Sequence, residues 1–484
     1  MFKPNELESI PLPFESLMAD LEMRIMQDIV RRIKINGEIT RAADWQIYRL
    51  EHLGESKRVI KKYIKEALGL NNAEINHLYK DVVRQGYSRD QSLYKAKGKE
   101  LIPFSDNKAL QQLISATVLH TGEDMKNITK SLGFAKKVDG KIVFEHIADY
   151  YQKTLDNAMM DISSGAFSYN EVLKRTVSEL TSSGLRTVDY ATGWSNRVEV
   201  ATRRAVMTGF NQVASKISDN NAKELDTEYF EVSWHGTARP DHQEWQGKVY
   251  KRKELVEICG LGSADGLCGC NCRHSYDPFI PGVSERTYTD EQLTEMNARE
   301  NTATEYRGKE YTAYEASQYQ RKMETLMRKQ RQDIKLLQEG GADEDDIINA
   351  RCRYHSTSAQ YVEFSKAMGL PQQRERMIVD GLGGVGVGKI KDSFATLTKV
   401  TTASGIKVTE VSKHLKDRVK ERGIEIESIK SALTNPLKKS NIREDKTQQF
   451  IGEKATVAIN VDTGKITTVW ATSSKKAKKL KGGI

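Results

Sequence analysis

The segment between Val232 and Arg286 restricts the fold of this chain more than any other stretch of its sequence. It contains four of the five cysteines, three of the nine histidines and two of the five tryptophans. These residue types pack, bind metals or carry out chemistry, and they are concentrated in 55 of the 484 residues. We therefore expect the segment to form either a dense packing core or a functional site.

The cysteines of this segment alternate with other residues in a way that suits an extended strand. Cys268, Cys270 and Cys272 are separated by single residues, and His274 continues the series. Because residues i and i+2 lie on one face of a strand, these groups would point in one direction. With a histidine from the preceding stretch, they offer the nitrogen and sulfur ligands of a tetrahedral zinc site. The candidate metal ligands are Cys268, Cys272, His274, His235 and His242.

Two other interpretations of this cluster stay open. The spacing is not the usual pair of Cys-x2-Cys motifs, so reduced thiols and hydrogen-bonded histidines in a loop-rich core also fit it. A cysteine activated by a histidine, as in covalent catalysis, is the third interpretation. We expect no disulfide framework, because the cysteine count is odd and the cysteines are clustered.

The composition suits a soluble, helix-rich protein of two to four domains, with 38% hydrophobic and 29% charged residues. No run of about 18 apolar residues is present, so we expect no membrane span. The N-terminus lacks the apolar core of a signal peptide. These features predict synthesis and folding in a reducing cytoplasm.

Apolar periodicity predicts a mainly α-helical body. Residues 14–35 have apolar side chains mostly at every fourth position, as in an amphipathic helix. Similar patterns at 40–52, 55–68, 71–85 and 106–120 complete an N-terminal helical region, 1–130. A second helical region, 131–225, ends in a long helix that begins near Trp194. Its outer faces would carry Arg197, Arg203 and Arg204, which form either a solvated face or a contact with DNA or an acidic partner.

The pattern changes after residue 225. A strand is expected at Tyr229–Trp234, and long helical patterns at 306–338 and 343–368 predict an αα-hairpin. Five glycines within Gly381–Gly388 indicate a flexible linker, because no Walker lysine–hydroxyl pair follows them. The expected divisions are a Cys/His/Trp-rich α/β core motif at 226–300, a helical hairpin at 301–380, a linker at 381–390 and a basic α+β domain at 391–484.

The net charge of +9 comes entirely from the last fifth of the chain. Residues 391–484 hold 20 Lys and Arg against 10 Asp and Glu, whereas the rest of the chain holds 55 against 56. A compact basic module predicts a nucleic-acid or nucleotide partner for that module. A solubilising tail is the alternative interpretation.

Within this module the pattern predicts helices packed on an antiparallel sheet. Ala455–Asn460 and Lys465–Trp470 flank a Val-Asp-Thr-Gly turn, as in a β-hairpin. Earlier in the module, His414, Arg418 and Arg422 recur at every fourth residue and would share a helix face. The expected fold class is therefore a mainly α body with a small loop-rich α/β segment, followed by a small α+β C-terminal domain.

These residue types suit metal-independent cleavage of RNA, in which the 2′-hydroxyl attacks the adjacent phosphate. A histidine would serve as general acid/base, and cations would stabilise the phosphorane. The candidate catalytic residues are His414, Arg418, Arg422, Thr468 and Ser473. The candidate substrate-binding residues are Lys454, Trp470 and Thr472, of which the indole would stack on a base. The alternative is a basic surface with a histidine packed at its edge.

The Cys/His segment also resembles a known family. Trp-His-Gly-Thr-Ala-Arg-Pro-Asp-His-Gln-Glu-Trp-Gln-Gly-Lys-Val-Tyr, Gly-Leu-Cys-Gly-Cys-Asn-Cys-Arg-His-Ser and Pro-Phe-Ile-Pro-Gly are similar to the signature of phage minor capsid protein 2, a family related to MuF-type head proteins. The resemblance covers roughly residues 5–380 and implies a low-copy protein of a tailed-phage head, near the portal. The family usually has Trp at the position of Cys270, which argues against Cys270 as an essential ligand. Cys268, Cys272 and His274 match the motif.

The basic module resembles phage-encoded nuclease domains of the barnase–EndoU–colicin–RelE type. The motifs are His414-x3-Arg418-x3-Arg422, Ser428-Ile-x-x-Ala-Leu-x-Asn-Pro436 and Thr456-Val-x-Ile-Asn-x-Asp-Thr-Gly464-Lys-Ile. Such domains are often fused to MuF-type head proteins and are thought to enter the host with the DNA, which implies RNase activity. No arginine–Ser-Thr-Ser–Glu-x-Glu series of an ADP-ribosyltransferase is evident.

Together these features predict a minor head protein, associated with the capsid or portal, that carries a toxin-like RNase domain. Cleavage would need no cofactor. A structural zinc ion at the Cys/His segment is the candidate metal. The expected partners are phage portal and capsid proteins, with RNA or DNA at the basic domain. The expected location is the phage head, after synthesis in the host cytoplasm. The rival hypothesis is a purely structural protein whose basic domain binds packaged DNA without catalysis.

Overall fold

The structure is a computed structural model of the whole chain. It describes residues 4–38, 58–70, 72, 74–78, 90–138, 141–189, 193–269, 272–377, 382, 384–385, 394, 397–398, 400–412, 415, 419 and 424–481. The expected helix at 40–52 and much of the one at 71–85 lie outside these residues. No helix within the described ranges is both long and apolar enough to cross a lipid bilayer.

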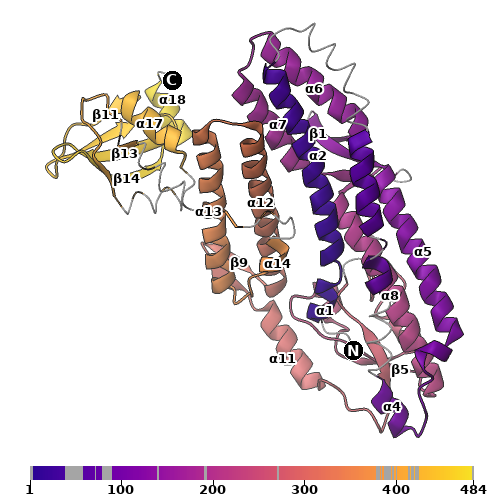
Figure 1. Ribbon diagram of the computed structural model, residues 1–484. Helices are drawn as coiled ribbons and strands as arrows, with labels where there is room; N and C mark the ends of the chain where they lie inside the picture. The colour runs from indigo at the N-terminus through magenta and orange to yellow at the C-terminus, as the bar shows by residue number, and fades with distance from the viewer. Residues whose placement is uncertain are drawn as a thin grey trace.

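The helical body is built around α2 (Leu12–Glu38), which follows the short helix α1 (Pro4–Ser9). Its apolar residues recur at intervals of three and four, so that they cover much of the helix surface. Ile25, Ile29 and Ile33 are completely buried. Figure 1 shows α2 between the helices of the hairpin on one side and those of the main bundle on the other. The predicted helix at 14–35 is confirmed, and it is the centre of the body.

Two of the helices around α2, α5 and α7, begin at residues whose side chains cap them. The Asn107 side chain accepts from the backbone N–H of Leu110, and Ser168 forms a capping box with Glu171. Both interactions satisfy N–H groups that have no partner within the first helical turn. The helices of this part are α4 (Gln91–Ala96), η1 (Phe104–Asp106), α5 (Lys108–Lys130), α6 (Ile147–Ser163), α7 (Tyr169–Ser183) and α8 (Val198–Glu224).

A four-stranded antiparallel sheet lies within the region that the sequence pattern predicted to be helical throughout. Its strand order is β2 (Lys141–His146), β1 (Leu132–Val138), β3 (Arg186–Val188) and β4 (Ser195–Arg197). Sequence analysis misses the sheet because β3 and β4 have only three residues each, and because the apolar residues of β2 are consecutive and do not alternate with polar ones. Pairing of β4 with β3 also explains why α8 begins at Val198 and not near Trp194.

Arg197, just before α8, and Arg203 and Arg204 within it differ in their surroundings. The side chains of Arg197 and Arg203 are 19% and 20% exposed, and Arg203 lies 3.0 Å from the carboxylate of Glu15. Only Arg204 is exposed, as the sequence pattern predicted for all three. The expected solvated face is therefore wrong for two of the three arginines, because α1, α2 and the hairpin cover that side of α8.

The Cys/His segment folds at the far end of α8. Its antiparallel sheet has the order β6 (Val249–Lys251), β5 (Tyr229–Val232) and β7 (Tyr276–Phe279), so the predicted strand at Tyr229–Trp234 is confirmed. The sheet packs on α8, and Figure 1 places it at the opposite end of the long helices from β1. The short helices α9 (Pro240–Gln243) and α10 (Arg252–Glu257) lie in its connections.

Two long antiparallel helices follow and form the predicted hairpin. Thr312 makes a capping box with Glu315 at the start of α12 (Ala313–Gly340), and Gly341 ends the helix with a φ of +71°. The second helix is α13 (Glu344–Ala367). Around the hairpin lie α11 (Asp290–Asn301), β8 (Thr304–Tyr306), β9 (Lys309–Tyr311) and α14 (Arg374–Met377).

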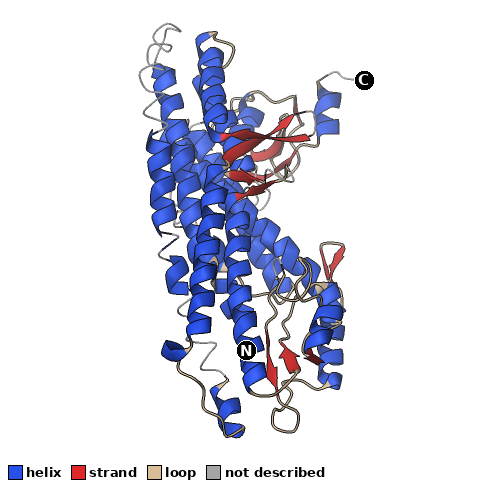
Figure 2. Cartoon of the chain, turned by 90° about the vertical axis from the view of Figure 1, so that its right-hand side faces the viewer, coloured by secondary structure: helices blue, strands red, loops and turns tan. Residues whose placement is uncertain are grey.

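The C-terminal domain is a five-stranded sheet with helices, as the fold class predicted. The strand order is β10 (Glu410–Val411), β14 (Lys465–Ala471), β13 (Ala455–Asn460), β12 (Thr447–Ile451) and β11 (Lys438–Lys439). Only β10 runs parallel to its neighbour. The helices α17 (Ile426–Thr434) and α18 (Ser474–Leu480) complete the described part of the domain. Figure 2 shows the strands in small separate groups beside a much larger helical part.

This domain is attached to α13 as well as to the chain that leads into it. Ile348 and Cys352 of α13 belong to the same hydrophobic core as Ile426 of α17. The Ile426 backbone N–H donates to the Asn349 side chain at 3.1 Å, and the ammonium group of Lys430 lies 2.8 Å from the carboxylate of Asp345. The domain in yellow therefore sits against the outer helix of the hairpin (Figure 1).

Truncation of Ile29 to Ala should lower the free energy of unfolding by about 2–5 kcal/mol, because it removes methylene groups from the fully buried face of α2. Leu119→Ala on α5 is the matched control, since this side chain is 70% exposed and its truncation should cost below about 1 kcal/mol. Denaturant unfolding monitored by circular dichroism measures both. Equal losses for the two variants would contradict the central role of α2.

Candidate functional site

The described part of the Cys/His segment brings three side chains together. His242 comes from α9, whereas Cys272 and His274 come from the extended residues before β7. Cys272 Sγ lies 3.4 Å from His274 Nδ1 and 3.9 Å from His242 Nδ1, and the two Nδ1 atoms are 3.4 Å apart. All three side chains are buried. We call His242, Cys272 and His274 the Cys/His cluster.

The local backbone explains this convergence. Ser233 and Ser275 exchange two hydrogen bonds of 2.9 Å, which hold the segment before β7 against the continuation of β5. Because alternate side chains of an extended segment point to opposite sides, Cys272 and His274 face the cluster while Arg273 points away. The guanidinium of Arg273 pairs with Glu8 instead. The predicted alternation is thus present for Cys272 and His274, whereas Cys268 does not share their face.

Two polar neighbours orient the imidazole rings. His274 Nε2 lies 2.9 Å from Gln246 Oε1, and the same oxygen accepts from the backbone N–H of His235. His242 Nε2 lies 2.8 Å from the carbonyl oxygen of Asp265 and 2.7 Å from Arg239 Nη2. Gln246 and Asp265 were not singled out by sequence analysis, because nothing in their residue types indicates that they face a histidine.

Burial sets the charge of these groups. It lowers the pKa of His274 well below its ordinary value, with the neighbouring imidazoles of His235 and His242 adding to the effect. Burial also lowers the pKa of His242. It raises the pKa of Cys272, although the backbone N–H of His274 donates to this sulfur and opposes the rise. The two imidazoles are therefore neutral near pH 7, and neutral imidazole is the form that coordinates metals.

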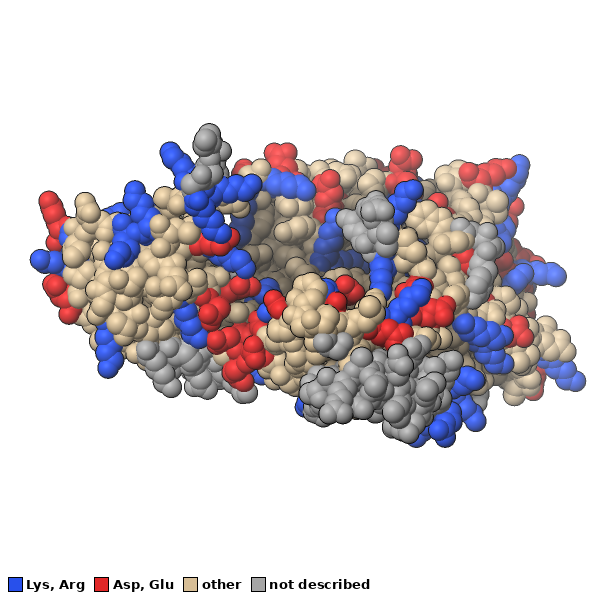
Figure 3. Space-filling model, turned by 90° about the horizontal axis from the view of Figure 1, so that it is seen from above, with Lys and Arg blue, Asp and Glu red and all other residues tan. Residues whose placement is uncertain are grey.

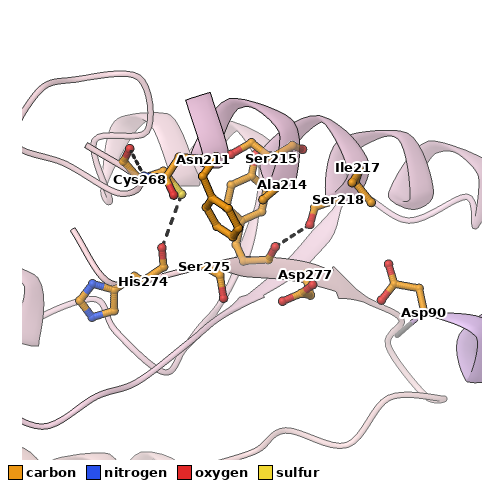
Figure 4. A pocket seen from close by; sticks show the side chains of 12 residues that line it. Asp90, Asn211, Ala214, Ser215, Ile217, Ser218, Cys268, His274, Ser275 and Asp277 are labelled. Atoms are coloured by element: carbon orange, nitrogen blue, oxygen red, sulfur yellow. Dashed lines mark hydrogen bonds between the residues drawn. The ribbon is translucent and has the colours of Figure 1, made fainter. Parts of the chain in front are cut away.

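Two of the five candidate ligands do not join the cluster. His235 Nδ1 lies 2.8 Å from the carbonyl oxygen of Gly236, and its ring stacks on that of His274 with centroids 4.3 Å apart. Burial, with Arg273 nearby, lowers the pKa of His235 to about 4. The Cys268 thiol donates to the carbonyl oxygen of His274 at 3.6 Å, whereas the His274 ring points away from it (Figure 4). Cys270 lies outside the described residues.

The Cys268 side of the segment faces α8 and encloses a small cavity of about 20 Å³. Its polar lining includes Asn211, Ser215 and Ser218 of α8 (Figure 4). Asn211 donates to the Cys268 carbonyl at 2.9 Å, and Ser218 donates to the Tyr276 carbonyl at 2.7 Å. A cavity of this size holds about one water molecule. These two bonds fasten the segment to α8, and the cavity itself is too small for an organic ligand.

A partly buried group of charges next to the cluster was not predicted. The Glu8 carboxylate pairs with Arg273, lies 3.1 Å from Arg376 Nη2 and lies 4.0 Å from Arg321 Nη2. Burial opposes ionisation of Glu8, but the three guanidinium groups outweigh it and hold its pKa below the ordinary value. These residues come from α1, the Cys/His segment, α12 and α14. Such distant positions give no local sequence signal.

One candidate catalytic residue, Thr468, and two candidate substrate-binding residues, Trp470 and Thr472, share one face of β14 and its continuation. Thr468, Trp470 and Thr472 alternate along the strand and its continuation, and each is partly exposed. The hydroxyl groups of Thr472 and Thr456 are 2.8 Å apart. The opposite face of the sheet carries Val469 and faces the core around α17. β13 and β14 pair antiparallel, with a register shift between Ala458 and Ile459, so the predicted β-hairpin is confirmed.

Ser473 and Lys454 are the other candidate residues of this domain that the structure describes. The Ser473 hydroxyl accepts from the Lys476 backbone N–H and caps α18. The Lys454 ammonium, 74% exposed, is 3.8 Å from the Glu425 carboxylate. His414, Arg418 and Arg422 lie outside the described residues, so their expected roles stay predictions. Seen from above, Lys and Arg side chains are spread over this end of the molecule, on the left of Figure 3, with fewer acidic ones between them.

Replacement of Glu8 by Gln should lower the free energy of unfolding by about 1–3 kcal/mol, because it leaves the partly buried Arg273, Arg321 and Arg376 without their shared carboxylate. Glu363→Gln removes the partner of Arg307 from a pair that is more than half exposed, and it should cost below about 1 kcal/mol. Urea unfolding at pH 7 compares the two. If Glu8→Gln loses no more stability than Glu363→Gln, then Glu8 does not stabilise the three guanidinium groups as proposed.

The Glu8→Gln variant also predicts how the stability of the chain depends on pH. Glu8 has a lowered pKa in the folded chain, so its contribution is fully present above the pKa of an unfolded glutamate, about 4.3. The contribution is lost as the pH falls through the folded value. The stability difference between the natural chain and Glu8→Gln should therefore be constant from pH 6 to 7 and shrink below about pH 4. A difference that grows in acid would contradict this sign.

Comparison with known proteins assigns the larger part of the chain. The family model described as "Phage minor capsid protein 2" matches residues 2–365, which include α1, the Cys/His cluster and nearly all of the helical hairpin. No curated protein and no solved structure matches the chain. The match covers most of the 484 residues, and it agrees with the resemblance seen in the sequence. The chain belongs to the phage minor capsid protein 2 family.

Proposed function

We propose that this protein is a low-copy structural component of a tailed-phage head, beside the portal, whose C-terminal domain cleaves RNA after entering the host with the DNA. Family membership over residues 2–365 makes it a structural protein of the virion. Its position at the portal, its part in packaging or ejection and its synthesis in the host cytoplasm belong to the proposal. The partners of the body would be the portal and capsid proteins.

The observation that carries the enzymatic half of the proposal is the C-terminal sheet domain. It lies beyond the matched residues, and most of its buried side chains come from its own strands and helices. It contains the whole basic excess of the chain. Thr468, Trp470 and Thr472 share one sheet face. A basic domain that exposes an indole and hydroxyl groups on one face suits a single-stranded nucleic acid.

The proposed reaction uses the 2′-hydroxyl of RNA as nucleophile. His414 would accept the proton of this hydroxyl while its oxygen attacks the phosphorus and the bond to the 5′-oxygen breaks. The leaving 5′-oxygen would take a proton from water, and the proton on His414 would return to solvent, so that the products would be a 2′,3′-cyclic phosphate and a 5′-hydroxyl. Arg418, Arg422 and Lys454 would stabilise the phosphorane charge, and the hydroxyls of Thr468 and Ser473 would position the phosphate. Thr472 and Trp470 would hold the nucleotide.

The rival function is DNA binding without catalysis. The observation in its favour is a run of lysines in α18 and at its C-terminal end. Their side chains are exposed; they are Lys476, Lys478, Lys479 and Lys481. Such a lysine-rich helix neutralises phosphates of any nucleic acid. This function predicts strongly salt-dependent DNA binding and no RNA turnover.

Purified full-length protein should cleave a fluorescent single-stranded RNA in buffer without divalent cations. His414→Ala should reduce the rate by about 10²–10⁴-fold, the usual contribution of a general acid/base. His120→Ala, at an exposed histidine of α5, is the matched control and should leave the rate unchanged. Full activity of His414→Ala would remove this residue from its role. Absence of turnover together with salt-dependent DNA binding would favour the rival function.

Trp470→Ala should weaken RNA binding by about 1–3 kcal/mol, the usual contribution of a stacked base, which corresponds to about 5–150-fold in Kd. Trp194→Ala removes an indole that is 76% exposed on the body and should not change the affinity. Fluorescence anisotropy with a 2′-O-methyl RNA measures binding in the absence of cleavage. Unchanged affinity for Trp470→Ala would place the nucleic acid on another face.

A further inference from the structure

We propose that the Cys/His cluster binds one zinc ion through His242 Nδ1, Cys272 Sγ and His274 Nδ1, and that this ion holds the two connections of the three-stranded sheet together. The inference rests on the body of the protein and is independent of the proposed RNase activity. Within the described residues, this is the group of His, Cys, Asp and Glu side chains whose ligand atoms lie within 4.8 Å of one another.

The separations of the three atoms match the edges of a zinc tetrahedron. Bonds of about 2.0–2.1 Å to nitrogen and 2.3 Å to sulfur at tetrahedral angles require about 3.4 Å between nitrogens and about 3.6 Å between nitrogen and sulfur. The observed separations are 3.4 Å between the Nδ1 atoms, and 3.4 and 3.9 Å from Sγ to the Nδ1 atoms of His274 and His242. Small side-chain adjustments bring all three atoms into coordination.

The hydrogen bonds of His274 direct a lone pair at this position. The backbone N–H of His235 only donates, so the Gln246 atom that it contacts is the carbonyl oxygen. That oxygen then accepts from His274 Nε2, which must carry the hydrogen. His274 Nδ1 is therefore unprotonated and points at Cys272 Sγ and His242 Nδ1. In the metal-free chain the Cys272 thiol can donate to this nitrogen at 3.4 Å, and a zinc ion that replaces the thiol proton would occupy the space between the same atoms.

The surroundings of His242 fit the same arrangement. Its Nε2 lies near an acceptor, the Asp265 carbonyl, and near a donor, the Arg239 guanidinium, so it can bond with only one of them in a given tautomer. Metal at Nδ1 leaves the hydrogen on Nε2, which then donates to the carbonyl. A carbonyl bonded to the outer nitrogen of a coordinating histidine is the common arrangement at zinc sites. Arg239 keeps Asp241 as its partner, at 2.8 Å.

The choice of zinc follows from the ligand types. Two imidazoles and one thiolate suit zinc, whereas magnesium and calcium prefer oxygen ligands. Binding releases the thiol proton of Cys272 to solvent, and the backbone N–H of His274 stabilises the resulting thiolate. The fourth position is left to a water molecule. The ligands are at most 5% exposed, which favours a structural role.

Full-length protein produced in zinc-supplemented medium should contain about one zinc per chain by elemental analysis. Replacement of zinc by Co²⁺ should give thiolate-to-cobalt charge-transfer absorption and intense tetrahedral d–d bands. Cys272→Ser should lose the charge-transfer absorption, whereas Cys268→Ser and Cys352→Ser should keep it. These two controls remove a neighbouring thiol that bonds to a carbonyl and a buried thiol in α13.

A milder variant keeps the test decisive if Cys272→Ser fails to fold. Gln246→Ala leaves all three ligands in place but removes the acceptor of His274 Nε2. It should weaken zinc binding by about 10–100-fold, measured by competition with a chromophoric chelator. Natural protein without zinc and without a cobalt spectrum would overturn the proposal. Zinc that is retained in Cys272→Ser and lost in Cys268→Ser would also overturn it.

Discussion

The structure depends first on the burial of α2. This helix packs against α6, α7, α8 and α12, so it must be apolar over much more of its surface than an ordinary amphipathic helix. Among its buried polar residues, Glu22 accepts hydrogen bonds from the Leu185 backbone and the Gln332 side chain. Burial raises the pKa of Glu22, and the guanidinium of Arg197 opposes the rise. Helix, sheet and hairpin are thereby fixed relative to one another.

A second constraint is the way in which charge fastens the ends of the body. Glu8 in α1 pairs with arginines from the Cys/His segment, α12 and α14. Residues more than 250 positions apart in the sequence therefore form one group of ion pairs. Arg273 belongs to this group while its neighbours Cys272 and His274 face the Cys/His cluster. The same extended segment therefore connects the ion pairs on one side with the proposed zinc site on the other. A substitution that disrupts the ion pairs of Glu8 should therefore also affect the Cys/His cluster, and the reverse should hold.

The hairpin joins the family body to the C-terminal domain. The matched region ends at residue 365 near the end of α13, and the same helix supplies Ile348 and Cys352 to the core of the C-terminal domain. The domain is therefore held against the body by apolar contacts and by the ion pair between Lys430 and Asp345. This arrangement lets one chain combine a structural role in the virion with the proposed action on nucleic acid.

The sequence alone determined the elements whose signal is local: the long helices, the C-terminal hairpin and the motif that identifies the family. Apolar periodicity, caps and turn residues act over a few positions, so they can be read without the partner segments. It also named the members of the Cys/His cluster, but with His235 and Cys268 included. Only the tertiary structure selected His242, Cys272 and His274, revealed the four-stranded sheet and paired Glu8 with its arginines. Long-range packing decides these features, because the atoms concerned meet only after the chain has folded.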